Sequence, residues 1–535
     1  MPTPTIPTDR FDGYVHADGG RLVDGAGRPL LLRGVGLGNW LLPEGYMWRF
    51  DGGPQSPREI EALITDLVGS EEAAQFWSAF QDTFITEADI DRIAAEGFDH
   101  VRLPINSRVV MDADGTLIPR GLELIDRTID WCRAHGLWVV LDLHGAPGGQ
   151  TGTNIDDSPR GRPELFEDPT YRRQTIELWR ALAERYARET IVAGYDLLNE
   201  PLPNEWQHLY PDRLVALYRD LTATIREVDP DHLIIYEGTH WANNWDIFTE
   251  VWDPNSMLQF HKYWNAPDRP SIERFITTGE RLGLPIYMGE GGENNLDWLQ
   301  TSFQLYEDLG ISWNFWPWKK IDTRTSPCSV TPPPGGAAIV ASGAGAGPRP
   351  APADAAAVLD HLLDSMRLKN CAYRHDITNA VLRRAPLRLP ATGFGFRGPG
   401  ISYQVNDGIP LKGFRADDAV TLRFAPGDEP DDLPFGHNTG TAREPHETFN
   451  VVLQPGDWLA YDLNVAHAEK YDVVVVGTST NRPHLWVDGR AVHLTGHGPS
   501  GHSWHTDPVA LGAGRHELRI GAATTELTFA ELQVL

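Results

Sequence analysis

The sequence predicts a (β/α)8 barrel followed by an all-β sandwich, and three observations support this prediction. The chain has 535 residues, more than one ordinary domain needs. Its first part alternates apolar, β-branched runs with amphipathic segments, the pattern of a parallel sheet buried on both faces. Beyond about residue 384 the chain changes to short alternating runs between turn residues, which is typical of an antiparallel sandwich. We therefore place the barrel, with an N-terminal hairpin, at residues 1–384 and the sandwich at residues 385–535.

Eight apolar runs form the predicted barrel strands. They are Leu30–Gly38, His100–Asn106, Leu137–Gly145, Ile191–Pro201, His232–Trp241, Met257–Trp264, Pro285–Gly292 and Ser312–Lys319. Amphipathic segments lie between them, namely Glu87–Glu96, Gly121–His135, Thr170–Arg188, Asp212–Val228, Ser271–Arg281 and Asn295–Asp308. Eight such units favour a closed barrel over an open doubly wound sheet.

Several segments add to this plan. Tyr14–Leu32 is predicted to be a hairpin ahead of the first strand, with its turn at Asp24–Gly27. A helical pattern in Pro57–Phe80 predicts a long connection between the first barrel strand and its helix. Residues 332–353 are rich in Pro, Gly and Ala, which predicts a mobile loop before an eighth helix at Ala355–Met366. In the sandwich we expect strands at Val420–Phe424, Trp458–Val465, Tyr471–Gly477, His484–Val487 and His516–Ile520.

Charge and composition exclude several classes of function. The chain has 46 basic and 74 acidic residues, a formal net charge of −28, which disfavours binding to nucleic acid or to anionic membrane surfaces. No apolar run has the roughly 18 residues of a membrane helix, and no signal peptide is visible, so we expect a cytoplasmic protein unless a leader was removed. Three cysteines without paired spacing exclude a disulfide-stapled scaffold. The glycine run Gly34–Gly38 lacks the spacing of a dinucleotide-binding loop, and Pro43 interrupts the helix that such a loop opens.

Polar and aromatic residues occur at nearly every predicted strand end. In chain order they are Asn39, Trp40, Arg102, His144, Asn199, Glu200, His240, Trp241, His261, Tyr263, Glu290 and Trp316. Burying such groups is costly, and the C-terminal ends of barrel strands meet at one face. The sequence therefore predicts a functional site at this face.

Two carboxylates indicate the chemistry of this site. Glu200 closes the fourth predicted strand and Glu290 closes the seventh, so they can flank a bond from opposite sides of the barrel mouth. Cleavage of a glycosidic bond needs one acid to protonate the leaving oxygen and one carboxylate to act at the anomeric carbon. Glu237, beside the fifth strand end, is either a third carboxylate of the pocket or a buried, hydrogen-bonded group.

Five short motifs carry a resemblance to a known family. They are Arg102-Leu103-Pro104, Asp142-Leu143-His144-Gly145, Asn199-Glu200-Pro201, His261-Lys262-Tyr263 and Gly289-Glu290. In this order, over roughly Gly34 to Lys320, they resemble glycoside hydrolase family 5 of clan A. The resemblance implies that Glu200 is the general acid/base, that Glu290 is the nucleophile and that the anomeric configuration is retained. We expect no cofactor, no metal at the active site and a carbohydrate as the partner; the oligomeric state and a structural calcium are left open.

The other residues at the strand ends have expected supporting roles. Arg102 is a permanent cation that would hold Glu290 ionised, and a charged Glu290 would make Glu200 harder to ionise. Asn199 can bind the sugar 2-hydroxyl and Tyr263 can donate to Glu290.

Histidine and tryptophan side chains complete the expected set. His144 and His261 can bind sugar hydroxyls, and Trp316 would form the platform beneath the sugar. Trp318 is the alternative platform, because side chains alternate along a strand and only one of the two tryptophans can face the site. Trp40 and Trp241 are further expected substrate contacts.

The substrate is less constrained than the reaction. His144–Gln150 is similar to the corresponding stretch of fungal exo-β-1,3-glucanases, which favours exo action on a glycoside or short oligosaccharide. Gly291–Asn294 and the first connection, Trp40–Trp48, depart from the family pattern, so a rutinosidase-like, β-glucosidase or galactofuranosidase-type activity all stay open. An endo-acting β-glucanase or mannanase is the alternative within the class. A catalytically inactive carbohydrate-binding protein is the alternative outside it.

The second domain has its own resemblance. Gly456–Asp462 and Leu511–Leu518 resemble carbohydrate-binding modules of families 6 and 35. These two segments form the core and the turns of such a sandwich, so the resemblance predicts the fold of the domain. They leave open whether the domain binds sugar, through Trp486 or Trp504 for example, or serves only as a structural partner of the barrel.

Overall fold

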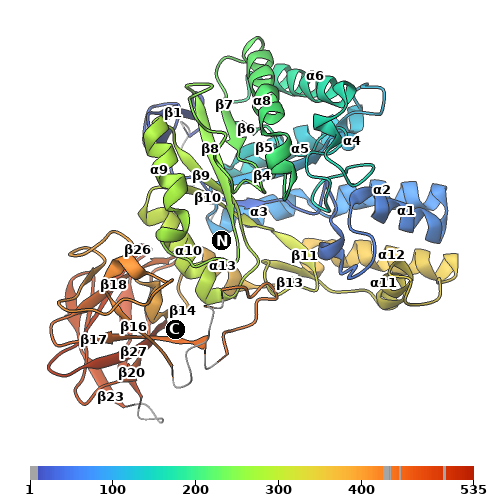
Figure 1. The fold of residues 1–535 in the computed structure, drawn as a ribbon. Coiled ribbons are helices and arrows are strands. Elements are labelled where there is room, and N and C mark those ends of the chain that lie inside the picture. Colours follow the sequence, from blue (N-terminus) through green and yellow to red (C-terminus); the bar gives the residue numbers. More distant parts are fainter. Residues whose placement is uncertain (1–9, 426–432, 434, 445–446, 498–501) are drawn as a thin grey trace. The chain divides into compact units, whose positions relative to one another are not determined.

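The structure is a computed structural model, and it describes residues 10–425, 433, 435–444, 447–497 and 502–535 (Figure 1). These residues form two compact units. The first comprises the described part of Met1–Lys262 together with Phe275–Gly291 and Ser312–Tyr373. The second comprises Tyr263–Arg274, Gly292–Ile311 and the described part of Arg374–Leu535. The boundary that we placed after residue 384 stays a prediction.

The predicted (β/α)8 barrel is confirmed: eight strands close into a parallel barrel in chain order. The strands are β3 (Arg33–Gly36), β4 (His100–Asn106), β5 (Trp138–Gly145), β6 (Val192–Asp196), β7 (Leu233–Glu237), β8 (Ser256–Lys262), β9 (Ile286–Gly292) and β10 (Ser312–Trp316). Seven of the strands lie within the predicted apolar runs, and β8 begins one residue before its run, at Ser256.

The fourth and fifth strands end earlier than the apolar runs predict. The run Ile191–Pro201 forms a strand only to Asp196, so Glu200 lies four residues beyond the strand. Glu200 has a left-handed backbone with φ 48°, which no strand residue adopts. His240 and Trp241 likewise follow β7 in left-handed conformations. The last residues of the predicted runs Ile191–Pro201 and His232–Trp241 therefore belong to the loops that follow β6 and β7.

Helices follow the strands as predicted, with short additions. Their bounds are α1 (Pro57–Val68), α2 (Ser70–Thr83), α3 (Glu87–Glu96), α4 (Ser107–Val110), α5 (Pro119–His135), α6 (Pro169–Tyr186), α7 (Trp206–Leu209), α8 (Pro211–Arg226), α9 (Glu273–Leu282), α10 (Leu296–Asp308), α11 (Gly336–Gly343), α12 (Pro352–Met366) and α13 (His375–Val381). Proline stands at the start of α5, α6 and α8, where its missing N–H leaves no hydrogen bond unmade. None of the helices in the described residues has both the length and the apolar character needed to cross a bilayer.

The predicted N-terminal hairpin is present and contains two turns. β1 (His16–Asp18) pairs with β2 (Arg21–Val23) across Gly19 and Gly20. The predicted turn at Asp24–Gly27 is also formed: the Gly27 N–H donates to the Asp24 carbonyl at 2.9 Å, and Val23 pairs antiparallel with Pro29. Gly19 has φ 56°, which a two-residue hairpin turn requires and glycine adopts without strain. The hairpin contributes Val15 and Leu22 to a buried cluster with residues near the amino-terminal ends of the barrel strands. The opposite end of the barrel is left for the site.

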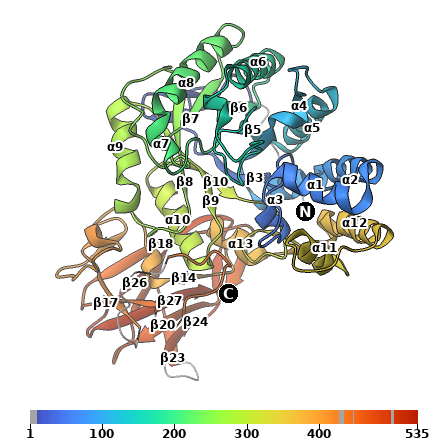
Figure 2. The same ribbon diagram turned by 45° about the vertical axis from the view of Figure 1, so that its right-hand side comes forward.

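Four helices build an additional layer beside the barrel. α1, α2, α11 and α12 lie side by side (Figure 2), and α12 packs against both α1 and α2. Our prediction of a loop across residues 332–353 is wrong over Gly336–Gly343, which forms α11. Its run Ala337-Ala338-Ile339-Val340-Ala341 contains helix-forming alanines between two terminal glycines, so composition alone concealed the helix.

The carboxyl-terminal part is all-β, with two main antiparallel sheets. The seven-stranded sheet contains β14 (Leu387–Pro390), β16 (Thr421–Phe424), β17 (Phe449–Leu453), β20 (Val473–Thr478), β23 (Leu494–His497), β24 (Ser503–Thr506) and β27 (Leu527–Val534). The five-stranded sheet contains β15 (Tyr403–Gln404), β18 (Trp458–Val465), β21 (His484–Val487), β22 (Arg490–Val492) and β26 (Gly514–Gly521). Tyr461 of β18 meets Phe529 of β27 with ring centroids 6.1 Å apart, which joins the two sheets as the layers of a sandwich.

Small sheets complete the described chain. β11 (Lys319–Ile321), β12 (Cys328–Val330) and β13 (Ala372–Tyr373) form one, and β19 (Glu469–Tyr471) and β25 (Val509–Leu511) form another.

Candidate active site

Arg102 is the centre of the polar network at the barrel mouth. It projects from β4 and is fully buried. Its Nη1 donates to Oε2 of Glu290 at 2.8 Å, and its Nη2 donates to Oδ1 of Asn199 at 2.8 Å. Nε donates to Oδ2 of Asp196 at 2.9 Å, and Nη2 also lies 3.2 Å from Oε1 of Glu237. One guanidinium therefore orients groups from β6, β7 and β9 together, as its planar fork of five donors allows.

Glu290 lies on β9 and only 5% of it is exposed. Burial raises the pKa of its carboxyl above the ordinary value, and the charge of Glu200 adds to this effect; His261 and Arg102 oppose it. Our expectation that Arg102 keeps Glu290 ionised therefore describes only part of the balance, because burial acts in the other direction. The two cations limit the rise of this pKa.

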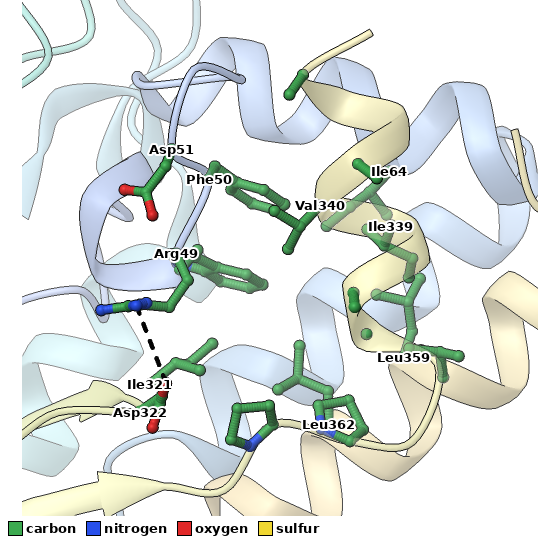
Figure 3. Close-up of a pocket in the computed structure, with 18 of the residues that line it drawn as sticks. Arg49, Phe50, Asp51, Ile64, Ile321, Asp322, Ile339, Val340, Leu359 and Leu362 are labelled. Atoms are coloured by element: carbon green, nitrogen blue, oxygen red, sulfur yellow. Dashed lines mark ion pairs between the residues drawn. The ribbon is translucent and has the colours of Figure 1, made fainter. Parts of the chain in front are cut away.

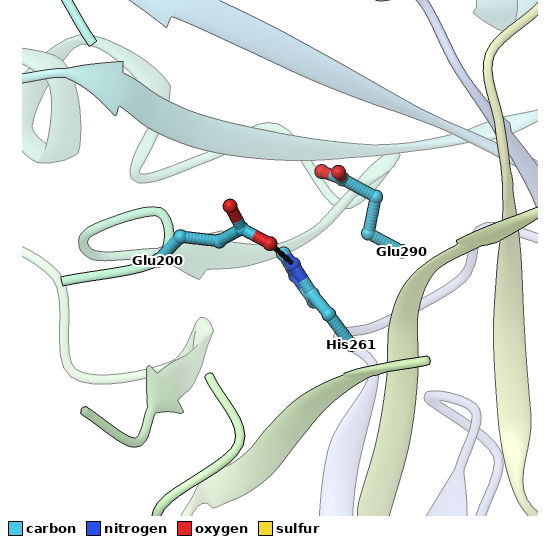
Figure 4. Close-up of side chains that lie close together, drawn as sticks. All are labelled: Glu200, His261 and Glu290. Atoms are coloured by element: carbon cyan, nitrogen blue, oxygen red, sulfur yellow. Dashed lines mark hydrogen bonds and ion pairs between the residues drawn. The ribbon is translucent and has the colours of Figure 1, made fainter. Parts of the chain in front are cut away.

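Glu200 lies on the loop after β6, opposite Glu290. Its backbone N–H donates to Oε2 of Glu237 at 2.7 Å, which holds the left-handed turn in place. Oε1 of Glu200 accepts from Nδ1 of His261 at 2.5 Å. Figure 4 shows the Glu200 and Glu290 side chains reaching toward one another, with the His261 ring directed at Glu200.

The two carboxylates are close together. One oxygen of Glu200, one oxygen of Glu290 and a ring nitrogen of His261 all lie within 4.8 Å of one another. Burial alone would lower the pKa of His261, but Glu237, Glu290 and Glu200 raise it well above its ordinary value. The trio therefore brings a proton donor beside two carboxylates, as proton transfer requires.

His144 and Asn199 form a second pair on the other side of Arg102. Nδ1 of His144 donates to Oδ2 of Asp142 at 2.7 Å, and Nε2 of His144 lies 3.3 Å from the amide nitrogen of Asn199. Burial lowers the pKa of His144 to about 4, so the ring is neutral at neutral pH. Nε2 then accepts from the Asn199 amide, which sets the orientation of this amide.

The indole of Trp316 lines the same region. It stacks on His144 with ring centroids 5.5 Å apart and an angle of 10° between the planes. A Cβ at Gly36 or Gly38 would lie 2.5 or 2.6 Å from the Trp316 ring, so these glycines, at the end of β3 and just after it, make room for the indole. The glycine run that lacks dinucleotide-loop spacing thus has a packing role.

Neighbouring aromatic residues occupy different places. Trp318 turns away, and its Nε1 donates to Oδ1 of Asp89 on α3 at 3.0 Å. Tyr46, in the 3-10 helix η1 (Gly45–Trp48), accepts from Nε1 of Trp316 at 3.1 Å. Of the two tryptophans that alternation left open, the structure brings Trp316 to His144 and places Trp318 against α3.

Three further predicted residues are Trp40, Trp241 and Tyr263, which follow the barrel strands β3, β7 and β8. Nε1 of Trp40 donates to the backbone carbonyl of Gln81 at 2.9 Å, so this edge of the indole is used within the first connection. Trp241 lies beyond β7 with its ring 4.8 Å from His240. Tyr263 directly follows β8. Sugar contacts of these three residues, and the bond from Tyr263 to Glu290, stay predictions.

Residues that the sequence did not single out complete the network. Gln150 is fully buried; its Nε2 donates to the backbone carbonyls of His144 and Asn199 at 2.7 and 2.9 Å. Gln259 of β8 donates to Glu237 and, at 3.0 Å, to Asp196. The only sequence signal for these amides was an isolated polar residue in a strand or in a glycine-rich turn.

The buried carboxyl groups of the network hold protons differently. Burial raises the pKa of Asp142 to about 8 and that of Asp196 well above its usual range, although Arg102 acts against both shifts. The pKa of Glu237 is lowered, because His261 and Arg102 outweigh its burial. We had left open whether Glu237 is a third carboxylate of the pocket or a buried, hydrogen-bonded group. The structure shows the buried, hydrogen-bonded group.

A parallel barrel with two facing carboxylates at its strand ends is the arrangement of a glycoside hydrolase, and comparison with known proteins agrees. The family model described as Cellulase (glycosyl hydrolase family 5) matches residues 64–322. A "Beta-xylosidase" of Phanerodontia chrysosporium is 30% identical over 347 residues, which are 58% of this chain and 71% of that protein. The chain belongs to glycosyl hydrolase family 5.

A further relative and a solved structure are similar to part of the chain. A "Probable glucan 1,3-beta-glucosidase A" of Emericella nidulans is 34% identical over 48% of this chain and 66% of its own length. The crystal structure of endoglucanase Cel5A from Thermotoga maritima is 22% identical over 54% of this chain and 89% of that chain, with a TM-score of 0.40. The chain thus spans just under two thirds of the length of the Emericella nidulans protein.

Proposed function

We propose that the protein is a retaining β-glycosidase that removes terminal sugars from glycosides or short oligosaccharides by double displacement. The observation that carries this proposal is the pair of carboxylates, with oxygens of Glu200 and Glu290 within 4.8 Å of one another. Retaining enzymes hold their carboxyl groups about 5–5.5 Å apart, whereas inverting enzymes need about 6.5–9.5 Å to admit a water molecule. The separation supports direct attack by one of the two carboxylates.

The surroundings of each carboxylate support its role. Glu290 accepts from Arg102, which holds its carboxylate in position to attack the anomeric carbon. Glu200 accepts from the protonated His261, which can supply the proton that Glu200 gives to the leaving oxygen. In the second step Glu200 takes a proton from water, and that water displaces Glu290 from the anomeric carbon.

Asn199 and Trp316 are positioned for the sugar itself. Oδ1 of Asn199 is held by Arg102 and its amide is turned by the neutral His144, so a second N–H of this amide is left to donate to the 2-hydroxyl. Such a contact strengthens as the oxocarbenium-like transition state forms. The indole of Trp316, stacked on His144, supplies a flat apolar face for the sugar ring.

The names of two relatives favour exo action. A "Beta-xylosidase" and a "Probable glucan 1,3-beta-glucosidase A" are both named for terminal β-linked sugars. We therefore propose β-xylosides and β-glucosides as the first substrates to test, ahead of β-galactofuranosides and β-rutinosides. An endo-acting glucanase or mannanase is the alternative within this class.

A hydrolysis panel tests the proposal. Aryl β-xyloside, β-glucoside, β-mannoside, β-galactofuranoside and β-rutinoside are incubated beside β-1,3- and β-1,4-glucans and mannan. Glu290→Gln serves as the inactive blank, and Glu205→Gln, at an exposed glutamate five residues after Glu200, serves as the matched control. Cleavage of an aryl glycoside by the wild type and by the control supports the exo-glycosidase. Cleavage of polymers alone would establish the endo alternative, and binding without turnover would establish an inactive carbohydrate-binding protein.

A further inference from the structure

Two features of the barrel unit are not used by the proposed mechanism. One is an apolar pocket of about 450 Å³ between the 3-10 helix η1, the end of β11 and the helices α1, α11 and α12 (Figure 3). Its lining, which includes Phe50, Ile64 and Leu359, consists of other residues than those of the active site. The second feature is the buried amide of Gln150, which contacts the active-site segments directly.

The amide of Gln150 joins the end of β5 to the loop after β6. Its Nε2 donates to the backbone carbonyl of His144 at 2.7 Å and to that of Asn199 at 2.9 Å. Its Oε1 accepts from the backbone N–H of Ala146 at 3.0 Å. Both N–H groups of the amide are thus used within the protein, and the side chain is fully buried. Gln150 can therefore act on the reaction only through the segments that it joins.

Glu200 lies between two residues of this loop that Gln150 anchors. The carbonyl of Asn199 accepts from the Gln150 amide, and the backbone N–H of Leu202 donates to the Gln150 carbonyl at 3.1 Å. Gln150 therefore contacts the chain one residue before Glu200 and two residues after it. The N–H of Asn199 also donates to the carbonyl of Leu143 in β5 at 3.1 Å, which ties the same segment to the barrel.

The backbone of this segment needs such contacts. Glu200 and Leu202 both have left-handed conformations, with φ 48° and 53°. Residues of these types adopt this region rarely, and they stay in it only where surrounding contacts hold them. Glu237 holds the N–H of Glu200 itself, and Gln150 holds the chain on either side. Without the Gln150 amide we expect the segment to relax and the Glu200 carboxyl to move.

We propose that Gln150 is a positioning residue that holds Glu200 within proton-transfer distance of the glycosidic oxygen. The inference rests on the proposed function, in which Glu200 is the general acid/base, and it adds the residue that sets the geometry of this step. Glu200 gives its proton to the leaving oxygen while the bond from that oxygen to the anomeric carbon breaks and Glu290 bonds to the carbon. A general acid acts only within hydrogen-bond reach of the atom that it protonates. A displaced loop therefore slows this transfer.

Leaving-group dependence tests this inference. A dinitrophenyl β-glycoside needs little protonation of its leaving oxygen, whereas a phenyl β-glycoside of the same sugar depends on the general acid. With the sugar that the aryl panel identifies, kcat/KM is measured for both substrates in the wild type, in Gln150→Met and in Glu200→Gln. Since general acid catalysis contributes about 10²–10⁴-fold, we expect the dinitrophenyl-to-phenyl ratio to rise by about tenfold or more in Gln150→Met. Glu200→Gln should change this ratio in the same direction.

Two further variants separate this effect from a loss of stability. Gln150→Glu keeps the length of the side chain and the acceptor for Ala146 but lacks the two N–H donors, so it serves if Gln150→Met is unstable. Gln174→Met is the matched control, because Gln174 is also buried and donates to a backbone carbonyl, that of Ala113, at 3.0 Å. This control should keep the wild-type ratio.

Azide gives a second measurement that a purely structural role would not change. Glu200 activates the water of the second step, whereas azide needs no base. With the dinitrophenyl glycoside, azide should therefore raise kcat of Gln150→Met, with β-glycosyl azide as the product, and leave kcat of the wild type nearly unchanged.

The outcomes distinguish the inference from the proposed function. An equal loss of kcat/KM with both leaving groups, no loss at all, or failure of both Gln150 variants to fold would overturn the positioning role of Gln150 alone. If Glu200→Gln showed no leaving-group dependence, or if the wild type hydrolysed no glycoside, the proposed function itself would be overturned.

Discussion

Arg102 donates from Nη1 to Oε2 of Glu290 at 2.8 Å, and both side chains are almost entirely removed from water. The same guanidinium contacts Asp142, Asp196 and Glu237, so a single cation from β4 faces four carboxyl groups. These groups in turn raise the pKa of Arg102 well above its ordinary value despite its burial. The charge that positions the proposed nucleophile is thus also the charge that makes this acidic barrel centre stable.

Replacing Arg102 should therefore affect stability as well as activity. In Arg102→Met the buried carboxyl groups lose their cation, and removing one partner of a buried pair costs about 3–5 kcal/mol. We expect the free energy of unfolding at pH 7 to fall by about this amount in urea denaturation. Arg173→Met, which loses only an exposed pair with Glu177, should change it by less than about 0.5 kcal/mol. Equal stability of the two variants would contradict the role of Arg102.

His261 should set the acid limb of the pH profile. Its positive charge lowers the pKa of Glu290 against the effect of burial. In His261→Asn this pKa should rise, so Glu290 becomes ionised only at higher pH and the acid limb of kcat/KM moves upward. Activity at the optimum should also fall, because Glu200 loses the donor 2.5 Å away. His467→Asn, at an exposed histidine of the second unit, should leave the profile in place; an unmoved limb in His261→Asn would refute the electrostatic account.

Asp142 should make the protein less stable as pH rises. Its pKa is raised to about 8 in the folded state, against about 3.9 in the unfolded chain. Between these values the folded state binds a proton that the unfolded state does not, so the free energy of unfolding falls as pH increases. In Asp142→Asn this contribution is absent. Thermal unfolding from pH 4 to 8 should therefore show a difference between wild type and variant that grows in favour of the variant, and a constant difference would contradict the shift.

Azide should distinguish the two glutamates by the product formed. In Glu290→Ala the anomeric carbon is open on the nucleophile side, so azide attack on an activated aryl β-glycoside should give the α-glycosyl azide. In Glu200→Ala the covalent intermediate still forms with such a leaving group, and azide should then give the β-glycosyl azide. The anomeric proton coupling in NMR spectra identifies each product. The opposite pair of products would exchange the two roles.

Most of the barrel and the main site residues could be predicted because parallel strands leave a strong signal. Strands buried on both faces form apolar runs, and a charged group such as Arg102 or Glu290 within such a run is unfavourable unless it has partners. The central sandwich strand β27, in contrast, was missed. Its burial alternates irregularly over Leu527–Val534, so no clean period of two marks it.

Contacts distant in the sequence account for the parts of the site that could not be predicted. Glu237 binds the backbone of Glu200 and Gln150 binds two carbonyl groups, yet neither role is encoded in a local pattern. The helix α11 was also missed, because the composition of residues 332–353 concealed it. The raised pKa values of Asp142 and Asp196 likewise depend on how many carboxyl groups surround Arg102. That number is determined only when the barrel closes.

The stereochemistry of hydrolysis tests the central claim most directly. The wild type is mixed with the best aryl β-glycoside of the panel, and the released sugar is followed by ¹H NMR within the first minutes, before mutarotation. Two displacements at Glu290 predict that the β-anomer appears first and that the α-anomer accumulates only at the rate of mutarotation. If the α-anomer appeared first, the reaction would be a single displacement by water, and Glu290 would not be the nucleophile.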